Sequence, residues 1–307
     1  MRKNKKRSLK ETEIVSPKVD FCFKELMEDS DIRKGFVAVI LSVQPEEIEQ
    51  TRLIPTHLRK QSDEEKLGIL DVRVMLADGI QIDFEIQVAP YPWWPERSVF
   101  YLAKMYTEQM EVGEDYKTIK KCIHVGILDF KLFPEDKEWY SCFHLWEDGR
   151  RRQYTDKLEV HIFELPKLNN VESSESELLD WMRFMNAEKK EEFEMLAAKN
   201  KYLGKAYGKL KKLSADKEWR LEYEARQKAI WDYNSMMKYN YEKGEHVGYE
   251  KGEIAGYERG ELQGKDLKLK EQIRKKLEKH KTAEQIAEEL EEELSVIEEM
   301  ILAMKQE

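Results

Sequence analysis

Two adjacent runs of the chain, residues 68–76 and 80–88, alternate apolar and polar side chains. The second run is apolar at even positions and polar at odd positions, and the first follows the same rule over residues 71–76. A period of two is typical of a β-strand with one buried face. Between the runs, Ala77, Asp78 and Gly79 include the Asp-Gly pair that marks a hairpin turn. The sequence therefore predicts two antiparallel strands whose even-numbered side chains are buried.

The length of the turn sets the register of this hairpin. A two-residue turn would pair Ala77 with Ile80 and place an even position opposite an odd one. A three-residue turn with Gly79 in the left-handed conformation pairs Leu76 with Ile80 and keeps all even positions on one face. Because a slip of one residue would move a strand's side chains to the other face, we expect the three-residue turn.

In this register two acidic side chains face each other on the polar side of the hairpin. Asp71 lies opposite Glu85, and Gln87 follows along the same face. Cβ atoms of opposed residues are roughly 5 Å apart, so the carboxylates repel unless a proton or a cation lies between them. A hard divalent ion, Mg²⁺ or Mn²⁺, suits such oxygen ligands. The alternative is a solvated face whose acids bind nothing. Asp83 is on the same face but lies farther along the strand from Asp71, so it is a weaker candidate for a metal ligand than Glu85.

Four short segments, two within the hairpin and two outside it, form a longer pattern. They lie at residues 16–24, which contain Asp-x-x-Phe-Lys, and at residues 68–72, 84–87 and 96–101, the last leading to Gln109, Gly113 and Tyr116. Together and in this order they resemble the PD-(D/E)XK nuclease superfamily. Within it, the chain is similar to the nuclease-family transposases, also described as recombination-promoting nucleases. The resemblance covers roughly residues 16–165.

This resemblance implies an α/β fold, with a restriction-endonuclease-like core of mixed sheet flanked by helices. It also implies that Asp71 and Glu85 ligate Mg²⁺, or Mn²⁺, together with the Ile86 carbonyl. The superfamily usually has a lysine two residues after the glutamate. This chain has Gln87 there, and the nuclease-family transposases that it resembles also have a glutamine at this position. An amide can orient the attacking water but brings no positive charge.

Other residues on the resembling segments are candidates to act on the scissile phosphate. Lys24 and Arg97 can restore the positive charge that Gln87 lacks, and Tyr101, one helical turn after Arg97, can donate to a phosphate oxygen. For the two cations the alternative is ordinary surface charge. For Tyr101 it is ordinary packing.

Composition narrows the class of protein further. The net charge of −9 argues against a generally basic nucleic-acid coat, although binding depends on local charge. No apolar run approaches the 20 or so residues that span a membrane, and the basic start lacks the apolar segment of a secretory signal. Cys22, Cys122 and Cys142 are expected to be reduced core residues, and the histidines are not expected to form a zinc site. These features favour a cytoplasmic protein without a membrane span, and DNA as its partner is what the family resemblance implies.

The chain divides by composition into five segments. They are a basic arm (1–15), a nuclease-like domain (16–168), a charged helical region (169–243), a glycine-repeat segment (244–265) and a C-terminal helical segment (266–307). Within the domain we expect helix over 20–43, broken near 29–31 and capped by Ser30 or Asp31. We expect a second helix over 96–111 with Val99 and Leu102 on its apolar stripe. A central strand is expected over 121–129 and an antiparallel pair over 139–146 and 154–165.

Glycine recurs at every fourth position from 244 to 264. Each glycine inside a helix costs about 1 kcal/mol relative to alanine, so six disfavour a lone helix. The segment is therefore either a flexible linker or a helix that packs closely against another. The second possibility, with the helical region that follows, suggests a homo-oligomer.

The function predicted from these features is a Mg²⁺-dependent DNA endonuclease that acts in recombination or transposition. The alternative is a catalytically weak or inactive nuclease fold that serves as a binding or oligomerisation module, because of Gln87, the acidic charge and the long helical tail. A weaker third possibility is a structural oligomer built on the glycine repeat.

Overall fold

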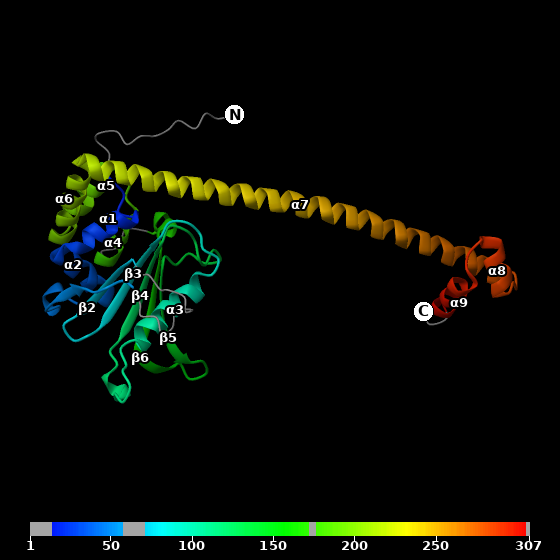
Figure 1. The fold of residues 1–307 in the computed structure, drawn as a ribbon, viewed down its shortest axis with the longest axis horizontal. Helices are drawn as coiled ribbons and strands as arrows, with labels where there is room; N and C mark the ends of the chain where they lie inside the picture. Colours follow the sequence, from blue (N-terminus) through cyan, green and yellow to red (C-terminus); the bar gives the residue numbers. More distant parts are fainter. Residues whose placement is uncertain (1–13, 58–70, 172–175, 305–307) are drawn as a thin grey trace. The chain divides into compact units, whose positions relative to one another are not determined.

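A mixed six-stranded sheet organises the first part of the chain. The computed structural model describes residues 14–57, 71–171 and 176–304, so most of the predicted basic arm and residues 68–70 lie outside the described residues. The chain divides after Asn234 into two units, which are described separately. In the sheet, the strand order is β1-β2-β3-β4-β6-β5 (Figure 1). The strands are β1 (Thr51–Leu53), β2 (Val72–Leu76), β3 (Gln81–Gln87), β4 (Cys122–Leu128), β5 (Tyr140–Glu147) and β6 (Arg152–Glu164).

The hairpin of β2 and β3 has the predicted register. Val72 pairs with Phe84, and Val74 pairs with Ile82. At the turn, the Leu76 N–H donates to the Ile80 carbonyl at 2.9 Å, and Gly79 has a φ of 91°. A side chain would be strained at this φ, so glycine is required at the third turn position. β4 is parallel to both β3 and β6, and it is the central strand, as predicted, while β5 and β6 form the predicted antiparallel pair.

Helices cover both faces of the sheet (Figure 1). One side carries α1 (Asp20–Glu28), α2 (Ser30–Leu41), α4 (Glu177–Asn186), α5 (Lys190–Ala197) and α6 (Lys201–Ala215), and the other carries α3 (Trp94–Thr107). Short 3₁₀ helices lie at Pro45–Glu47, Tyr116–Thr118 and Leu165–Asn170. On the first side, Phe36 packs against Phe84 with ring centroids 5.2 Å apart and against Trp181 at 5.1 Å. This is the predicted α/β fold of mixed sheet and flanking helices.

The prediction that β3 has a single buried face is wrong. Asp83 and Glu85, on the polar face, are 0% and 3% exposed. The reason is α3, whose buried side chains are Trp94, Ser98, Tyr101, Leu102 and Met105. Val99, expected on this buried stripe, is 57% exposed. Because α3 covers the odd-numbered face, the acids of β3 are removed from water.

Two smaller expectations also differ from the structure. The chain breaks at Asp29, and Asp29 itself caps α2 by accepting from the N–H groups of Asp31 and Ile32, at 3.0 and 3.2 Å. Neither Ser30 nor Asp31 has that role, because both are already helical. Cys22 and Cys122 are buried as expected, but Cys142 is exposed because it lies on the edge strand β5.

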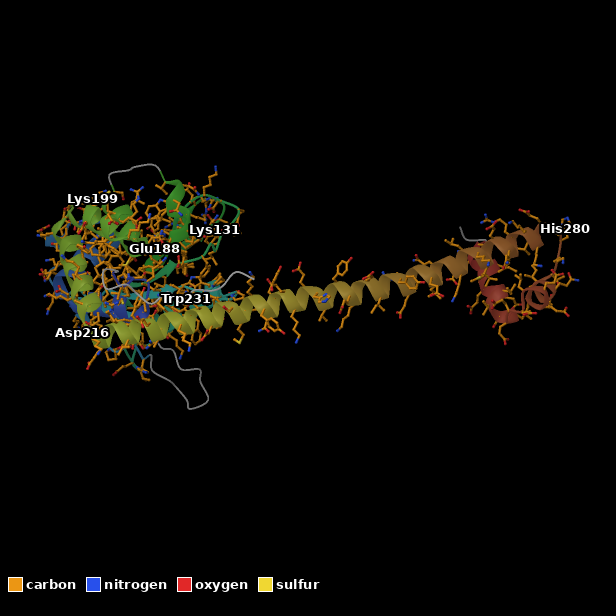
Figure 2. All side chains as sticks on the ribbon, turned by 90° about the horizontal axis from the view of Figure 1, so that it is seen from above. Lys131, Glu188, Lys199, Asp216, Trp231 and His280 are labelled. Carbon is orange, nitrogen blue, oxygen red and sulfur yellow. The ribbon has the colours of Figure 1, made fainter. Side chains whose placement is uncertain are left out.

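A 61-residue helix, α7 (Lys217–Leu277), contains the glycine repeat. Figure 2 shows side chains projecting all around it between Trp231 and His280. A Cβ built on any of the six repeat glycines meets no atom within 4 Å. The structure thus has helix where a flexible linker was one of two expectations.

The end of α7 packs with two short helices, α8 (Ala283–Leu290) and α9 (Leu294–Met304). Their shared core contains Ile273, Ile286 and Ile297, all fully buried. Thr282 caps α8 with a capping box, in which Gln285 is the reciprocal partner. Within the described ranges, no helix combines the length and apolarity needed to cross a membrane.

Candidate active site

Asp71 immediately precedes β2, which begins at Val72. Continuing the pairing of Val72 with Phe84 by one residue places Asp71 opposite Glu85. The Ile86 N–H donates to Asp71 Oδ2 at 3.2 Å, and the Lys24 ammonium on α1 is 3.8 Å from Oδ1. Burial raises the pKa of the Asp71 carboxyl above its usual range, although Lys24 and the Ile86 N–H act to lower it.

The Ile86 peptide faces the same edge of β3 as Asp71. Backbone hydrogen bonds of β3 alternate between its two neighbours. The N–H of odd-numbered Gln81 donates to the Lys121 carbonyl beside β4, whereas the carbonyl of even-numbered Ile80 accepts from Leu76 of β2. The N–H and C=O of one strand residue point to the same neighbour. Since the Ile86 N–H reaches Asp71, its carbonyl is directed to the β2 side as well.

Glu85 is buried between the sheet and α3. Its Oε1 accepts two hydrogen bonds from Arg97, one of them from Nε at 2.8 Å. Its Oε2 has no hydrogen-bond partner among the described residues. Burial, and next to it the charge of Asp83, raises the pKa of Glu85 to about 7. His124 and Arg97 act in the opposite direction without cancelling this rise.

Behind Glu85 lies a buried pair that the sequence analysis missed. His124 Nδ1 is 2.7 Å from Asp83 Oδ2, and both side chains are 0% exposed. One ligand atom from each of Asp83, Glu85 and His124 lies within 4.8 Å of the others. Asp83 Oδ1 and His124 Nε2 have no partner in the described part of the chain. The parallel register that sets Asp83 beside His124 has no signature in the sequence.

The first turns of α3 position the cationic side of the site. The Arg97 guanidinium stacks on the Tyr101 ring at 4.9 Å and lies 5.7 Å from the Tyr91 ring. Tyr101 is 5% exposed, so its ring gives Arg97 a fixed support. Gly126, opposite Glu85 on β4, makes room for this helix, because a Cβ there would lie 2.7 Å from the Trp94 ring.

Comparison with known families gives a result that agrees with this geometry. The family model of the PD-(D/E)XK nuclease family transposases matches residues 17–240. The chain belongs to this family. The match extends beyond residue 165 through α4, α5 and α6 into α7. No curated protein and no solved structure matches the chain.

Gln87 occupies the position that a lysine has in most of the superfamily. It is partly buried at the end of β3, two residues after Glu85 on the same face. Its amide Nε2 donates to the Ala89 carbonyl at 3.1 Å. In place of the lysine, two cations from other elements reach the acids: Lys24 lies near Asp71 and Arg97 near Glu85.

The donor atoms of this candidate site fit a divalent ion. Asp71 and Glu85 supply carboxylate oxygens, the ligands that Mg²⁺ and Mn²⁺ prefer. A buried carboxylate oxygen without a partner, such as Glu85 Oε2, carries a large desolvation cost that a cation would offset. The site residues predicted from the sequence therefore gather at one end of the β2–β3 hairpin.

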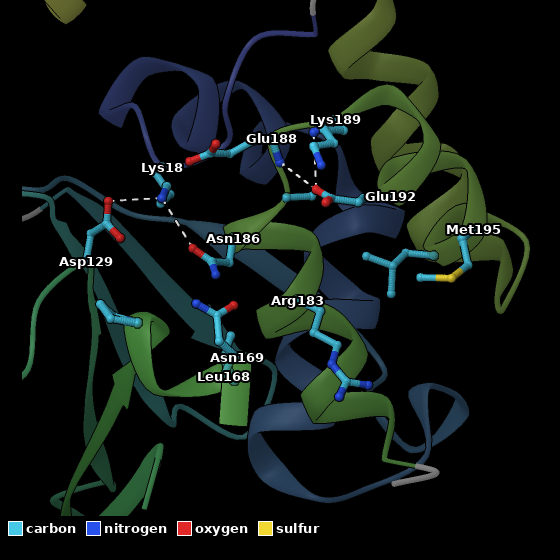
Figure 3. A pocket seen from close by; sticks show the side chains of 13 residues that line it. Lys18, Asp129, Leu168, Asn169, Arg183, Asn186, Glu188, Lys189, Glu192 and Met195 are labelled. Atoms are coloured by element: carbon cyan, nitrogen blue, oxygen red, sulfur yellow. Dashed lines mark hydrogen bonds and ion pairs between the residues drawn. The ribbon is translucent and has the colours of Figure 1, made fainter. Parts of the chain in front are cut away.

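A pocket of about 600 Å³ lies on the α1/α4 side of the molecule (Figure 3). There, Lys18 bridges Asp129 at 2.9 Å and Asn186 at 3.3 Å. The pocket is lined by Arg183, Lys189 and Glu192 as well. None of its lining residues belongs to the acidic site, and Lys18 is paired with other lining residues, so we assign no chemistry to this pocket.

Proposed function

We propose that this protein is a Mg²⁺-dependent DNA endonuclease that acts in recombination or transposition, with Mn²⁺ as an alternative ion. The observation that carries the proposal is the meeting of Asp71 and Glu85 at one end of the hairpin, with a buried Glu85 oxygen that lacks a partner among the described residues. Membership of the nuclease-transposase family supports DNA as the substrate.

Asp71, Glu85 and the Ile86 carbonyl would hold the ion. A divalent ion held there supplies Lewis-acid activation of the attacking water and offsets charge on the phosphate. Gln87 orients the water through its amide oxygen while its Nε2 is held by the Ala89 carbonyl. The ion binds only when the Glu85 carboxylate is ionised. Because the pKa of Glu85 is raised to about 7, we expect cleavage to fall as the pH drops below that value.

Arg97 has two roles in this proposal. Its charge lowers the pKa of Glu85 and so favours the ionised carboxylate that a metal needs. Its side chain is also 33% exposed, so the guanidinium can reach a phosphate when a metal takes its place at Glu85. Tyr101 holds the guanidinium by stacking, and Lys24, 45% exposed beside Asp71, adds a second cation at the phosphate.

The decisive experiment is cleavage of supercoiled plasmid with Mg²⁺, Mn²⁺ or EDTA. Wild type is compared with Asp71→Asn and Glu85→Gln, and with Glu96→Gln, an exposed carboxylate on the first turn of α3, as a matched control. We expect metal-dependent nicking by wild type and the control, and none by the other two. Cleavage that persists in both site variants would remove the assignment of the site.

The competing function is a nuclease fold that binds or assembles without cutting. Gln87 favours it, since it leaves the site without the usual lysine. The contact of Arg97 with Glu85 favours it as well, since it occupies a carboxylate oxygen that a metal would use. Calorimetric titration with Mg²⁺ separates the two. Binding that Asp71→Asn abolishes, together with cleavage, supports the nuclease; neither binding nor cleavage in wild type supports the binding module.

We also propose that the C-terminal helical region makes the protein a homo-oligomer in the cytoplasm. The glycine repeat leaves the backbone of α7 open to close approach by another helix, and the three cysteines are free, as in a reducing compartment. Light scattering on the full chain and on a chain lacking residues 244–264 tests the assembly. An unchanged oligomer mass after the deletion contradicts it.

A further inference from the structure

A second set of metal-ligand side chains lies on β5 and β6. Cys142 and His144 alternate on β5, and Glu159 and His161 alternate on β6. Cys142 pairs with His161, and His144 pairs with Glu159. Because directly opposed residues of paired strands point to the same face, all four side chains gather on one side of the sheet.

The four side chains contact one another in a closed ring. Cys142 Sγ is 3.8 Å from His161 Nε2 and 4.0 Å from His144 Nε2. Glu159 completes the ring, with Oε1 at 3.0 Å from His144 Nε2 and Oε2 at 3.4 Å from His161 Nε2. His161 thus directs Nε2 toward both the thiol and the carboxylate. His144 directs Nε2 toward the carboxylate and presents both ring nitrogens to the thiol, Nδ1 at 3.9 Å and Nε2 at 4.0 Å.

These four spacings resemble the edges of a tetrahedral zinc site. Bonds of about 2.0–2.1 Å to nitrogen and oxygen and about 2.3 Å to sulfur place neighbouring ligands roughly 3.3 Å (N to O) and 3.6 Å (N to S) apart. No three of these residues bring ligand atoms within 4.8 Å of one another. Metal binding therefore requires both diagonals of the ring to shorten, through rotation of the Cys142 and His144 side chains on the edge strand β5 toward Glu159 and His161.

Neighbouring residues support the ring as a metal site would require. The Tyr140 hydroxyl is 2.9 Å from His161 Nδ1, which fixes that ring with Nε2 toward the thiol. The Lys121 ammonium contacts Glu159 Oε1 and leaves Oε2 for a ligand bond.

We propose that Cys142, His144, Glu159 and His161 form a zinc site that fastens the edge strand β5 to β6. A thiolate, two imidazoles and a carboxylate match the borderline-soft character of Zn²⁺ rather than Mg²⁺. The two anionic ligands balance the charge of the ion. Cys142 is exposed, so the ion has a direct path to the site.

This site is separate from the proposed nuclease centre. Glu159 and His161 pair with Ile123 and Val125 of β4, whose side chains belong to the core under α1 and α2. His124, between them, points to the opposite face. The role of the zinc site is therefore structural. Because the pairing of β5 is irregular just after His144, a metal cross-link would hold the edge strand in register at that point.

Cobalt substitution and thiol protection test the proposal on the full chain. EDTA-treated protein is titrated with Co²⁺, and we expect a thiolate-to-cobalt absorption band that Zn²⁺ removes by competition. In parallel, Zn²⁺ should slow alkylation of Cys142, followed by peptide mass spectrometry, in wild-type protein. Absence of the band, together with an alkylation rate that Zn²⁺ does not change, overturns the proposal.

Variants locate the site. Cys142→Ser and His144→Ala should remove the cobalt band. Tyr140→Phe should weaken zinc binding about tenfold or more, because it removes the hydroxyl at His161 Nδ1. The matched control is His246→Ala, which removes an exposed histidine paired with Glu250 at 3.6 Å without a thiol nearby. Loss of binding in this control but not in Cys142→Ser means that the metal is bound elsewhere, and overturns the assignment.

A further variant separates this inference from the proposed nuclease site. Asp71→Asn should abolish plasmid cleavage and leave the cobalt band unchanged. If Asp71→Asn removes the cobalt band as well, the ion belongs to the hairpin site and the β5–β6 assignment is wrong. If cleavage is absent in wild type while the band is present, the zinc site stands and the nuclease function alone fails.

Discussion

Glu85→Gln should make the metal-free protein more stable at pH 8, although it removes a residue of the proposed active site. Burial and the adjacent Asp83 raise the pKa of Glu85 from 4.5 to about 7. The fold therefore binds the Glu85 proton more tightly than the unfolded chain does. Stability is lost as pH rises from the unfolded pKa through the folded pKa, because over that interval the native state must give up a proton it prefers to keep.

The size of the effect follows from the shift. One pKa unit corresponds to about 1.4 kcal/mol, so a rise of roughly 2.5 units costs about 3 kcal/mol of unfolding free energy once Glu85 is ionised. The stabilising contact with Arg97 is already contained in that shift. A glutamine carries no charge at any pH, so the variant avoids the cost. Arg97 loses its partner, but its side chain is one-third exposed and can be solvated.

Urea unfolding in EDTA, at steps from pH 4.5 to 8, measures this difference. All seven tryptophans precede residue 235, so their fluorescence reports on the unit that contains the site. We expect wild type and Glu85→Gln to have similar stability near pH 4.5 and to diverge to about 3 kcal/mol by pH 8. Glu135→Gln, an exposed carboxylate between β4 and β5, is the control and should follow wild type.

Two outcomes would refute this reasoning. If Glu85→Gln is less stable than wild type at pH 8, the ion pair with Arg97 outweighs the burial of the carboxylate. If the difference between the two proteins does not change with pH, Glu85 does not titrate in this interval, and the buried carboxylate is satisfied in some way other than by a proton or a metal.

Three further predictions concern the same site and its support. Saturating Mg²⁺ should raise the melting temperature of wild type at pH 8 and not that of Glu85→Gln, measured by differential scanning fluorimetry, because only the carboxylate holds the ion. Arg97→Met should move the acid limb of the cleavage profile to higher pH, since Arg97 lowers the pKa of Glu85; a limb at lower pH contradicts this. Gly126→Ala should cost about 1–3 kcal/mol in urea unfolding through its clash with Trp94, whereas Gly260→Ala, with open space around it, should not destabilise its helix.

The hairpin was predictable because its information is local. Alternation fixed which side chains of β2 and β3 share a face, and the need to keep Leu76 opposite Ile80 fixed the turn. Gly79 has the left-handed φ that this turn demands. Such arguments use only residues near one another in the sequence, so the meeting of Asp71 with Glu85 could be inferred before any long-range contact was known.

The surroundings of the acids were not predictable in this way. Nothing in the β3 sequence indicates that α3 covers its polar face, and the apolar stripe expected on that helix includes Val99 rather than Tyr101. The same limit hid the contact of His124 with Asp83, because a parallel partner far away in the sequence leaves no mark in either strand alone. The Cys142–His161 contact lies within the predicted antiparallel pair, but the irregular pairing after His144 sets a register that alternation alone does not give.

The charges at the hairpin explain why the site is both costly to fold and suited to phosphate chemistry. Three carboxylates, those of Asp71, Asp83 and Glu85, face two cations, Lys24 and Arg97, which leaves one net negative charge if the neighbouring histidine is neutral. A site with this balance repels a phosphate group. A divalent ion at the proposed site would reverse the sign to one net positive charge. With Gln87 in place of the usual lysine, that ion would therefore determine whether the site attracts DNA, and above the raised pKa of Glu85 it would offset the free energy lost in burying the carboxylate.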